Sequence, residues 1–274
     1  MLNFHFLPLC LTKKIEYSIK NKKFLEVNMR SKKIHFLLII FILTFFYCAP
    51  KEEPEVLPIY HCYKTSEEII IDGNITEEAW EKAEEAQFVN RDGSIPEQKT
   101  TFKWLWDDVY LYGAFHVEDN DIWATMTVRD DSLWVEEVIE LFIDADSAPK
   151  TYAEFEINPL NTVLDLYILN KYNNRKDIYQ LWKWDCIGLK NAVKVVGTVD
   201  NRDDVDQYWD LEIAIPFDQI YTAPNIPPVV CDRWKIDFCR ADSKGKKRSV
   251  STVWSPPAFH NPLSYGIFIF EAGK

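Results

Sequence analysis

The sequence predicts an all-β protein, folded as an antiparallel β-sandwich with one or two short helices. Short segments rich in Val, Ile, Tyr, Phe and Trp recur along the chain, and several alternate apolar with polar residues, as half-buried strands do. Polar turns separate these segments, and only two short stretches have a helical pattern. Many short strands with little helix are typical of two antiparallel sheets packed together in one domain.

The N-terminal region is predicted to lie outside this domain. Residues 34–47 form an apolar run between the basic segment 30–33 and Cys48. This pattern is typical of a secretory signal and is too short for a comfortable membrane span. Cys48 is therefore predicted to be a lipoprotein cysteine. Simple secretion and an uncleaved anchor stay open, because bulky Tyr47 stands where a small residue usually precedes such a cysteine.

These features divide the chain into four expected parts. They are a spurious upstream extension at 1–28, a signal peptide at 29–48, a tether at 49–66 and the β-sandwich at 67–274. The expected location is the bacterial cell envelope, where an exported and lipid-anchored protein faces the periplasm or the cell surface.

The first elements of the sandwich are a strand and a short helix. Residues 69–71 are the strand, and Thr76 is a candidate N-cap followed by two acidic residues, which favour a helix start. Two alternating runs, 99–106 and 109–119, then flank a pair of aspartates and predict a β-hairpin. Further strands are predicted at 138–144, 152–158, 163–169, 192–199, 208–215, 234–240, 249–254 and 265–270, with a second short helix near Phe217.

The charge of the chain excludes one large class of partner. The formal net charge is -12, and residues 49–274 alone carry 23 basic and 41 acidic side chains, a net charge of -18. Binding to a phosphate backbone requires Lys and Arg that displace counterions, so no nucleic acid partner is expected. Ten Trp and thirteen Tyr exceed the needs of an ordinary core, which favours an aromatic-lined binding surface.

Four cysteines follow Cys48, and their spacing does not indicate a metal site. They are Cys62, Cys186, Cys231 and Cys239. An exported protein can form disulfides, and four cysteines allow three full pairings. Since the sequence has no CxxC or His-rich spacing of the kind that binds zinc, buried thiols or a single bridge are expected.

One stretch, residues 132–146, combines a strand with a candidate ligand contact. Its apolar run at 138–143 is interrupted by Glu140, and a carboxylate in such a run is costly to bury unless it is paired. Trp134 lies six residues upstream, in a polar segment from which a large ring can project. A ring beside a carboxylate is suited to a sugar, because the ring stacks on the apolar face and the carboxylate accepts from hydroxyls. The alternative is a half-buried packing residue beside a solvated acid.

Six motifs in order resemble one family. IDGNITEEAW, WDDVYLYGAFHVED, DSLWVEEVIELFID, YAEFEINP, WDLEIAIPF and WSPPAFHNPLSYG together resemble the family 9 carbohydrate-binding modules, over residues 69–270. The resemblance implies a jelly-roll-like sandwich that binds glycans without catalysis and supports carbohydrate catabolism. The implied partners are an oligosaccharide or polysaccharide and envelope glycoside hydrolases, and the family often carries structural Ca²⁺.

The resemblance also implies a ligand site. In the family, two loop aromatics clamp a terminal sugar, and these positions match Trp134 and Phe259. Glu140 matches the acidic ligand, and His260 follows the second ring. Phe259 replaces a Trp of the family, and Glu156 stands where sugar-binding members carry Arg, which exchanges a donor for an acceptor.

Two residues of the late strand bear on the predicted site. Arg240 is expected to contact the ligand; alternatively, it forms a salt bridge to Glu140. The glutamine-like position of the family corresponds to Cys239. Trp182 and Trp184 alternate with Lys183 and are expected to share a face, either as an extension of the sugar platform or as core.

A calcium site is predicted in the acidic segment 200–206. Asp203, Asp204 and Asp206 supply carboxylate oxygens, the ligands that hard cations prefer, although the order of an EF-hand is absent. The calcium would be structural, as the resemblance implies.

Two other function classes stay open. A glycoside hydrolase would use a carboxylate pair such as Glu140 and Glu156. A haem-binding sandwich of the same superfamily would need axial ligands, for which the exported part of the chain offers Met126 and the histidines His61, His116 and His260.

Overall fold

The computed structural model describes residues 56–170, 178–244, 247–257 and 259–274. Within these residues the only helices are short 3₁₀ turns, at Glu78–Glu81, Leu133–Val135, Phe217–Gln219 and Pro262–Ser264. All other regular structure is β, so the predicted all-β class is confirmed. None of the helices among these residues is long and apolar enough to span a membrane.

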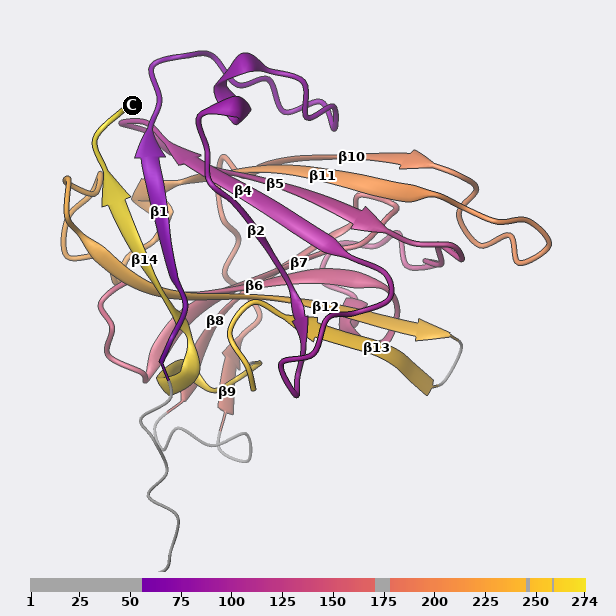
Figure 1. Ribbon diagram of the computed structural model, residues 1–274. Coiled ribbons are helices and arrows are strands. Elements are labelled where there is room, and N and C mark those ends of the chain that lie inside the picture. Colours follow the sequence, from indigo (N-terminus) through magenta and orange to yellow (C-terminus); the bar gives the residue numbers. More distant parts are fainter. Residues whose placement is uncertain (1–55, 171–177, 245–246, 258) are drawn as a thin grey trace, which may run out of the picture. The chain divides into compact units, whose positions relative to one another are not determined.

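A single curled sheet contains the fourteen strands of the described residues (Figure 1). Its main path runs β10-β11-β5-β4-β1-β14-β12-β6-β7-β8-β9, and β2, β3 and β13 pair at its margins. The strands are β1 (Ile59–Lys64), β2 (Glu85–Gln87), β3 (Val89–Asn90), β4 (Thr100–Trp106), β5 (Tyr110–Glu118), β6 (Val138–Asp144), β7 (Thr151–Ile157), β8 (Val163–Asn170), β9 (Ile178–Leu181), β10 (Lys190–Val196), β11 (Tyr208–Pro216), β12 (Arg233–Lys244), β13 (Lys247–Val253) and β14 (Gly266–Glu271). Neighbours are antiparallel except around β1, which runs parallel to both β14 and β4.

The curl of the sheet places two halves face to face over one aromatic core. Phe238 of β12 lies 4.9 Å from the ring of Phe102 and 5.0 Å from that of Trp104, both on β4. The ring of Phe115 on β5 lies 5.6 Å from the ring of Phe238. Since these rings come from both halves and are fully buried, their removal from water stabilises the sandwich.

The first strand of the sheet lies where a tether was predicted. Strand β1 joins the two halves, and Tyr60 and Cys62 are buried while His61 is part-exposed. This alternation is the pattern of a strand, but the charges and prolines just before it favoured a tether. The sheet therefore begins earlier in the chain than the predicted boundary at residue 67.

The segment after β1 differs from the predicted strand and helix. Residues 69–71 form a loop, in which buried Ile69 packs with Trp80 against Leu105 and Ala114 on the outer face of β4 and β5. The following turn is 3₁₀, its N-cap is Glu77, and no side chain caps it, so the predicted Thr76 cap is wrong. Tertiary burial of Trp80 decides the conformation here.

All four cysteines within the described residues are free thiols. Cys62, Cys186 and Cys239 are buried and Cys231 is exposed. The expected signal peptide and its candidate lipidation residue Cys48 lie outside the described residues.

Candidate functional site

The floor of the candidate site is built by β6 and β7. Glu140 pairs with Glu156 in the antiparallel register, and Phe142 pairs with Glu154. Side chains alternate between faces along a strand, so all four point to the outer face, while Leu141 and Phe155 point to the core. One carboxylate oxygen from each of the three glutamates lies within 4.8 Å of the other two.

A cavity of about 230 Å³ lies above this floor. Its walls come from segments far apart in the sequence: the turn before β6, strand β9 and the loop before β14. The lining residues are Trp134, Glu140, Glu154, Glu156, Gln180, Phe259 and His260. Five of the predicted ligand residues, Glu140 among them, therefore line this pocket.

Trp134, which lines the pocket, packs against a second tryptophan, Trp182, at the edge of the site. Their ring centroids are 6.1 Å apart and their planes are inclined by 48°. Trp182 is 42% exposed, and Trp134 is part-exposed. Trp184 points instead to the core, where it packs against Tyr167 and Phe155, so the expectation that the two tryptophans share a face is wrong.

Phe259 lines the pocket as a buried wall. Its side chain is only 2% exposed, and its ring lies 6.4 Å from that of Phe142 and 5.6 Å from the guanidinium carbon of Arg91. A ring without an exposed face has little area for a sugar to cover. The exposed aromatic surface beside Trp134 therefore belongs to Trp182 and not to Phe259.

His260 connects the loop before β14 to the acidic floor. Its Nδ1 lies 2.9 Å from the Tyr152 hydroxyl, and its Nε2 lies 4.0 Å from Oε1 of Glu154. The imidazole packs edge-on to Phe142 at 5.3 Å. These contacts place a polar ring, able to donate or accept, at the wall of the pocket.

Arg240 does not reach the pocket. It neighbours Ile139 across β12 and β6, whereas Cys239 neighbours Glu140, so Arg240 lies on the interior face. Its fully buried guanidinium bonds Asp119, lies 3.3 Å from Glu137 and donates to the Glu118 carbonyl at 2.9 Å. The predicted ligand role of Arg240 and its predicted salt bridge to Glu140 are both replaced by this buried ion cluster.

The predicted calcium ligands are not gathered into one group. Asp206 accepts hydrogen bonds from the backbone amides of Ile122 and Thr198, both at 2.7 Å, and thereby fastens two loops. Asp204 accepts from the Thr198 hydroxyl, and Asp203 is exposed. Among the described residues, the acidic groups close enough to hold a cation lie elsewhere.

Three such acidic groups occur in the described part of the chain, and two of them enclose an arginine. Arg240 lies among one group, and Arg129 pairs with Asp165 and Asp185 of another. The groups are Asp119, Glu137 and Asp242; Asp130, Asp165 and Asp185; and Glu140, Glu154 and Glu156. Carboxylates such as these could hold a metal such as Ca²⁺, but a guanidinium already supplies positive charge to the first two.

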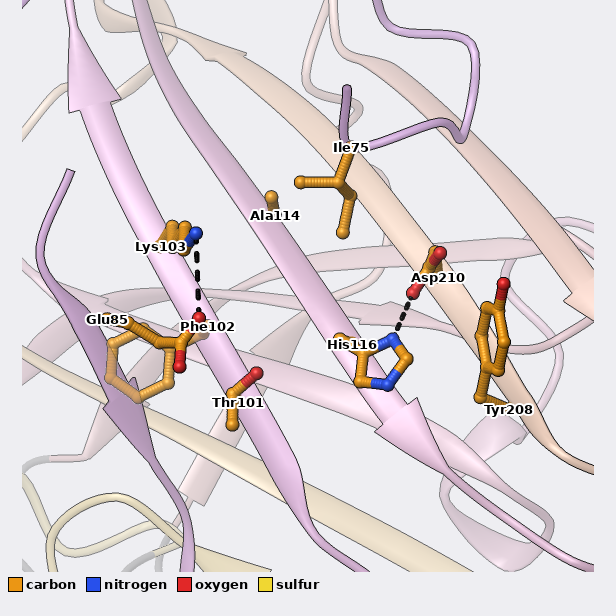
Figure 2. Close-up of a pocket in the computed structure, with 9 residues that line it drawn as sticks. All are labelled: Ile75, Glu85, Thr101, Phe102, Lys103, Ala114, His116, Tyr208 and Asp210. Carbon is orange, nitrogen blue, oxygen red and sulfur yellow. Dashed lines mark hydrogen bonds and ion pairs between the residues drawn. The ribbon is translucent and has the colours of Figure 1, made fainter. Parts of the chain in front are cut away.

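A second hollow lies on the opposite outer face, over β4, β5 and β11. Figure 2 shows His116 turned toward Asp210, with Tyr208 on one side and Thr101 on the other. The Nδ1 of His116 lies 2.7 Å from Asp210, and this hydrogen bond raises the pKa of the imidazole. The hollow has a volume of about 490 Å³, but apart from the proposed axial histidine His116 it contains no predicted site residue.

The histidines offered as haem ligands have separate partners. His61 lies 2.8 Å from Glu271, His116 contacts Asp210 and His260 contacts Tyr152. Because these contacts are on β1, on β5 and in the loop before β14, the structure does not assemble them around one haem.

Two pocket residues were missed by sequence reasoning. Glu154 is two residues before Glu156 on the same strand, so alternation could have placed it on the same face. Gln180 pairs with Ile168 across β9 and β8, a register that depends on long-range pairing.

The fold and the pocket define a β-sandwich with an aromatic-rimmed, acidic cavity on the outer face of one half. The family model described as "Carbohydrate family 9 binding domain-like" matches residues 71–272, and the chain belongs to this family.

Solved structures share this fold at low sequence identity. A family 9 carbohydrate-binding module from Caldicellulosiruptor kristjanssonii, in complex with cellotriose, has a TM-score of 0.54 and 15% identity, covering 79% of this chain and 95% of that one. A protein from Bacteroides uniformis has a TM-score of 0.58 and 16% identity, covering 79% of this chain and all (100%) of that one.

One curated relative matches part of the sequence. An "Extracellular protein" of Arthroderma benhamiae is 32% identical over 97 residues, and the match covers 32% of this chain. The match spans 43% of that relative's length.

Proposed function

We propose that this chain is a non-catalytic carbohydrate-binding protein and that the pocket above Glu140 holds the sugar. The observation that carries the proposal is the pocket itself. Five residues predicted from three separate motifs line one cavity on the fold of a carbohydrate-binding family. The similar module from Caldicellulosiruptor was solved with cellotriose and with glucose, which supports a sugar ligand.

In the proposed mechanism, the tryptophans stack on the sugar and the floor residues form hydrogen bonds with it. The apolar face of the sugar stacks on Trp134 and Trp182, which adds about 0.5–1.5 kcal/mol per ring beyond area burial. Hydroxyl groups of the sugar donate to Glu140, Glu154 and Glu156, which accept as carboxylates, and Gln180 offers amide donors. So small a site corresponds to micromolar to millimolar affinity.

Titration calorimetry of the full chain against a panel of glycans tests the proposal. The expected result is binding that Trp134→Ala weakens about tenfold, because the stacking surface is lost. Tyr179→Ala is the matched control: Tyr179 is a 64% exposed ring on the same edge strand as Gln180, on its other face. No heat from any glycan at tens of millimolar would contradict the proposal.

The proposed setting is the cell envelope, where the protein captures glycans for catabolism or for partner hydrolases. The apolar run before Cys48 and the extracellular relative support export. Lipid attachment at Cys48 predicts that radioactive palmitate labels the chain in a bacterial host and that Cys48→Ala loses the label. If the Cys48→Ala variant is still labelled, the proposed lipid attachment at Cys48 is wrong.

A glycoside hydrolase is the second candidate, favoured by the short separation of Glu140 and Glu156. Retaining enzymes place two carboxyls about 5–5.5 Å apart, one on each side of the bond that breaks. Here the two residues are direct neighbours on adjacent strands of one floor. Release of reducing sugar from a panel glycan, lost in Glu156→Gln, would establish hydrolysis; we expect no release.

A further inference from the structure

A long groove lies on the outer face opposite the sugar pocket. The hollow over β4, β5 and β11 has a volume of about 490 Å³, and a second hollow has a volume of about 470 Å³. His116 and Tyr208 line both hollows, so the two are continuous. The second hollow extends the groove past the end of β5 and the start of β11, where Gln98, Asn120 and Gln207 lie.

The strand register builds the floor of this groove in successive rows. Thr101, His116 and Asp210 are direct neighbours across β4, β5 and β11, and Glu118 and Tyr208 form the next row. Alternate residues of a strand point to one face, so these side chains share the outer face. Since rows on one face lie about 7 Å apart, a groove that spans several rows is longer than one sugar ring.

The two basic side chains among the described lining residues are each paired with a carboxylate (Figure 2). Nδ1 of His116 lies 2.7 Å from Asp210, and Nζ of Lys103 lies 3.5 Å from Glu85. Glu118, also in the lining, adds negative charge. An anionic chain would therefore meet like charge and gain little from cations that already form ion pairs.

Other lining residues both donate and accept hydrogen bonds. Gln98, Asn120 and Gln207 carry amides, and Thr101 and Tyr208 carry hydroxyls. The hydroxyl groups of a glycan also donate and accept, so these side chains can pair with a hydroxyl in either role. A neutral ligand rich in hydroxyls is matched to this lining.

Two part-exposed rings give the groove a stacking surface. The ring centroids of His116 and Tyr208 are 4.7 Å apart and their planes are inclined by 49°. The His116 side chain is 42% exposed, and Tyr208 is part-exposed. Aromatic rings pack against the apolar faces of sugar rings through area burial. Because the two rings lie where the hollows join, they would contact the middle of a chain.

We propose that this groove is a second glycan site, which binds an internal segment of a neutral polysaccharide. The inference rests on the proposed function and adds a site on the opposite face. The pocket above Glu140, with its volume of about 230 Å³, holds one sugar unit. The groove holds several units along the strands, with sugar rings on Tyr208 and His116. A long chain therefore binds at either site, whereas a monosaccharide is held by the pocket alone.

Titration calorimetry of the full chain with short and long sugars separates the two sites. The probes are glucose, xylose and mannose, and the corresponding β-1,4-linked chains cellohexaose, xylohexaose and mannohexaose. Trp134→Ala should weaken monosaccharide binding about tenfold but hexasaccharide binding by less than about threefold, because the groove is intact. Adding Tyr208→Ala to this variant should weaken hexasaccharide binding about tenfold. Tyr208→Ala alone should leave monosaccharide binding unchanged.

Two further variants show whether these effects come from the groove. Thr101→Trp places a bulky ring over the floor of the groove and leaves the Tyr208 ring in place. In the Trp134→Ala background it should weaken hexasaccharide binding as much as Tyr208→Ala does. Tyr179→Ala removes a 64% exposed ring outside both sites and should change neither affinity.

The outcomes separate this inference from the function on which it rests. Hexasaccharide binding that Trp134→Ala abolishes, or that neither Tyr208→Ala nor Thr101→Trp weakens in that background, would overturn the groove site and leave the pocket intact. Hexagalacturonate, an anionic chain, binding the Trp134→Ala variant as tightly as the neutral chains would overturn the ligand class. No binding of any probe to the unsubstituted chain, together with no response across the glycan panel, would remove the proposed function too.

Discussion

Glu212 is a buried carboxyl that couples folding to pH. It lies on the outer face of β11 and accepts hydrogen bonds from the Trp80 indole at 3.2 Å and from the amides of Asp72 and Gly73 at 3.1 and 2.9 Å. Burial raises the pKa of Glu212 to about 7, against an ordinary value of 4.5. The loop over this half of the sheet is thus fastened to a carboxyl that holds its proton near neutral pH.

The raised pKa predicts a loss of stability as the pH rises. Between about pH 4.5 and pH 7 the folded chain keeps a proton on Glu212 that the unfolded chain has released. The free energy of unfolding therefore falls with rising pH in this window. Glu212→Gln stays neutral and still accepts hydrogen bonds, so the fall between pH 5 and pH 8 should shrink by about 1–2 kcal/mol.

Urea denaturation at the two pH values measures this effect. The exposed variant Glu78→Gln should leave the fall unchanged. An unaltered fall in Glu212→Gln would show that this carboxyl does not titrate in the window.

Arg240 is predicted to matter for stability and not for sugar affinity. Its guanidinium pairs with Asp119 in the interior and lies beside Glu137, whose pKa burial raises well above its ordinary value. Removing the guanidinium from this buried cluster leaves the Asp119 charge without compensation. Arg240→Ala should cost about 3–5 kcal/mol of unfolding free energy, measured by urea denaturation. Under conditions where the variant is folded, its sugar affinity should match that of the unsubstituted chain; a selective loss of affinity would instead return Arg240 to the site.

Among single residues, those on the floor of the pocket were predicted from the sequence more accurately than the aromatic residues at its edge. Glu140 could be predicted because a carboxylate inside an apolar strand is unusual, and Glu156 because its motif resembles that of the family. The face of Arg240 could not, because a shift of one residue in register exchanges the two faces of a strand. The burial of Phe259 depends on packing against Phe142, which local sequence does not reveal.

At the scale of elements, the hairpin of β4 and β5 depends on a close approach of ring and backbone. Gly113 lies opposite Trp104, and a Cβ at this glycine would come within 2.5 Å of the Trp104 ring. Gly113→Ala should destabilise the fold by about 1–3 kcal/mol through overpacking, measured by chemical denaturation. The double variant with Trp104→Phe should recover part of this loss, and strict additivity of the two changes would contradict the contact.

The elements that the sequence predicted correctly have clear alternation or dense β-branched and aromatic content. Strands β6, β7, β11 and β14 fall close to their expected ranges. Strand β1 was assigned to a tether because its neighbours are charged and rich in proline, and its pairing with β14 is a contact between opposite ends of the described chain. Residues 69–71 have strand composition but serve as an apolar cover for the sheet.

At the scale of the whole sandwich, the two outer faces differ in what they offer a ligand. One face carries the acidic pocket with its tryptophan rim, and the other carries the hollow around His116 and Asp210 (Figure 2). The order of the six motifs predicted the fold, since each marks a strand or a loop of the family. The relative position of the loops over β6 and β7, which creates the pocket, required the structure.

A crystal structure of the chain with its tightest-binding sugar shows which surface holds the ligand. We expect electron density for a pyranose in the pocket, with its apolar face on Trp134 and its polar groups within hydrogen-bond distance of Glu140. A sugar bound in the hollow around His116, with the pocket above Glu140 holding only water, would contradict it.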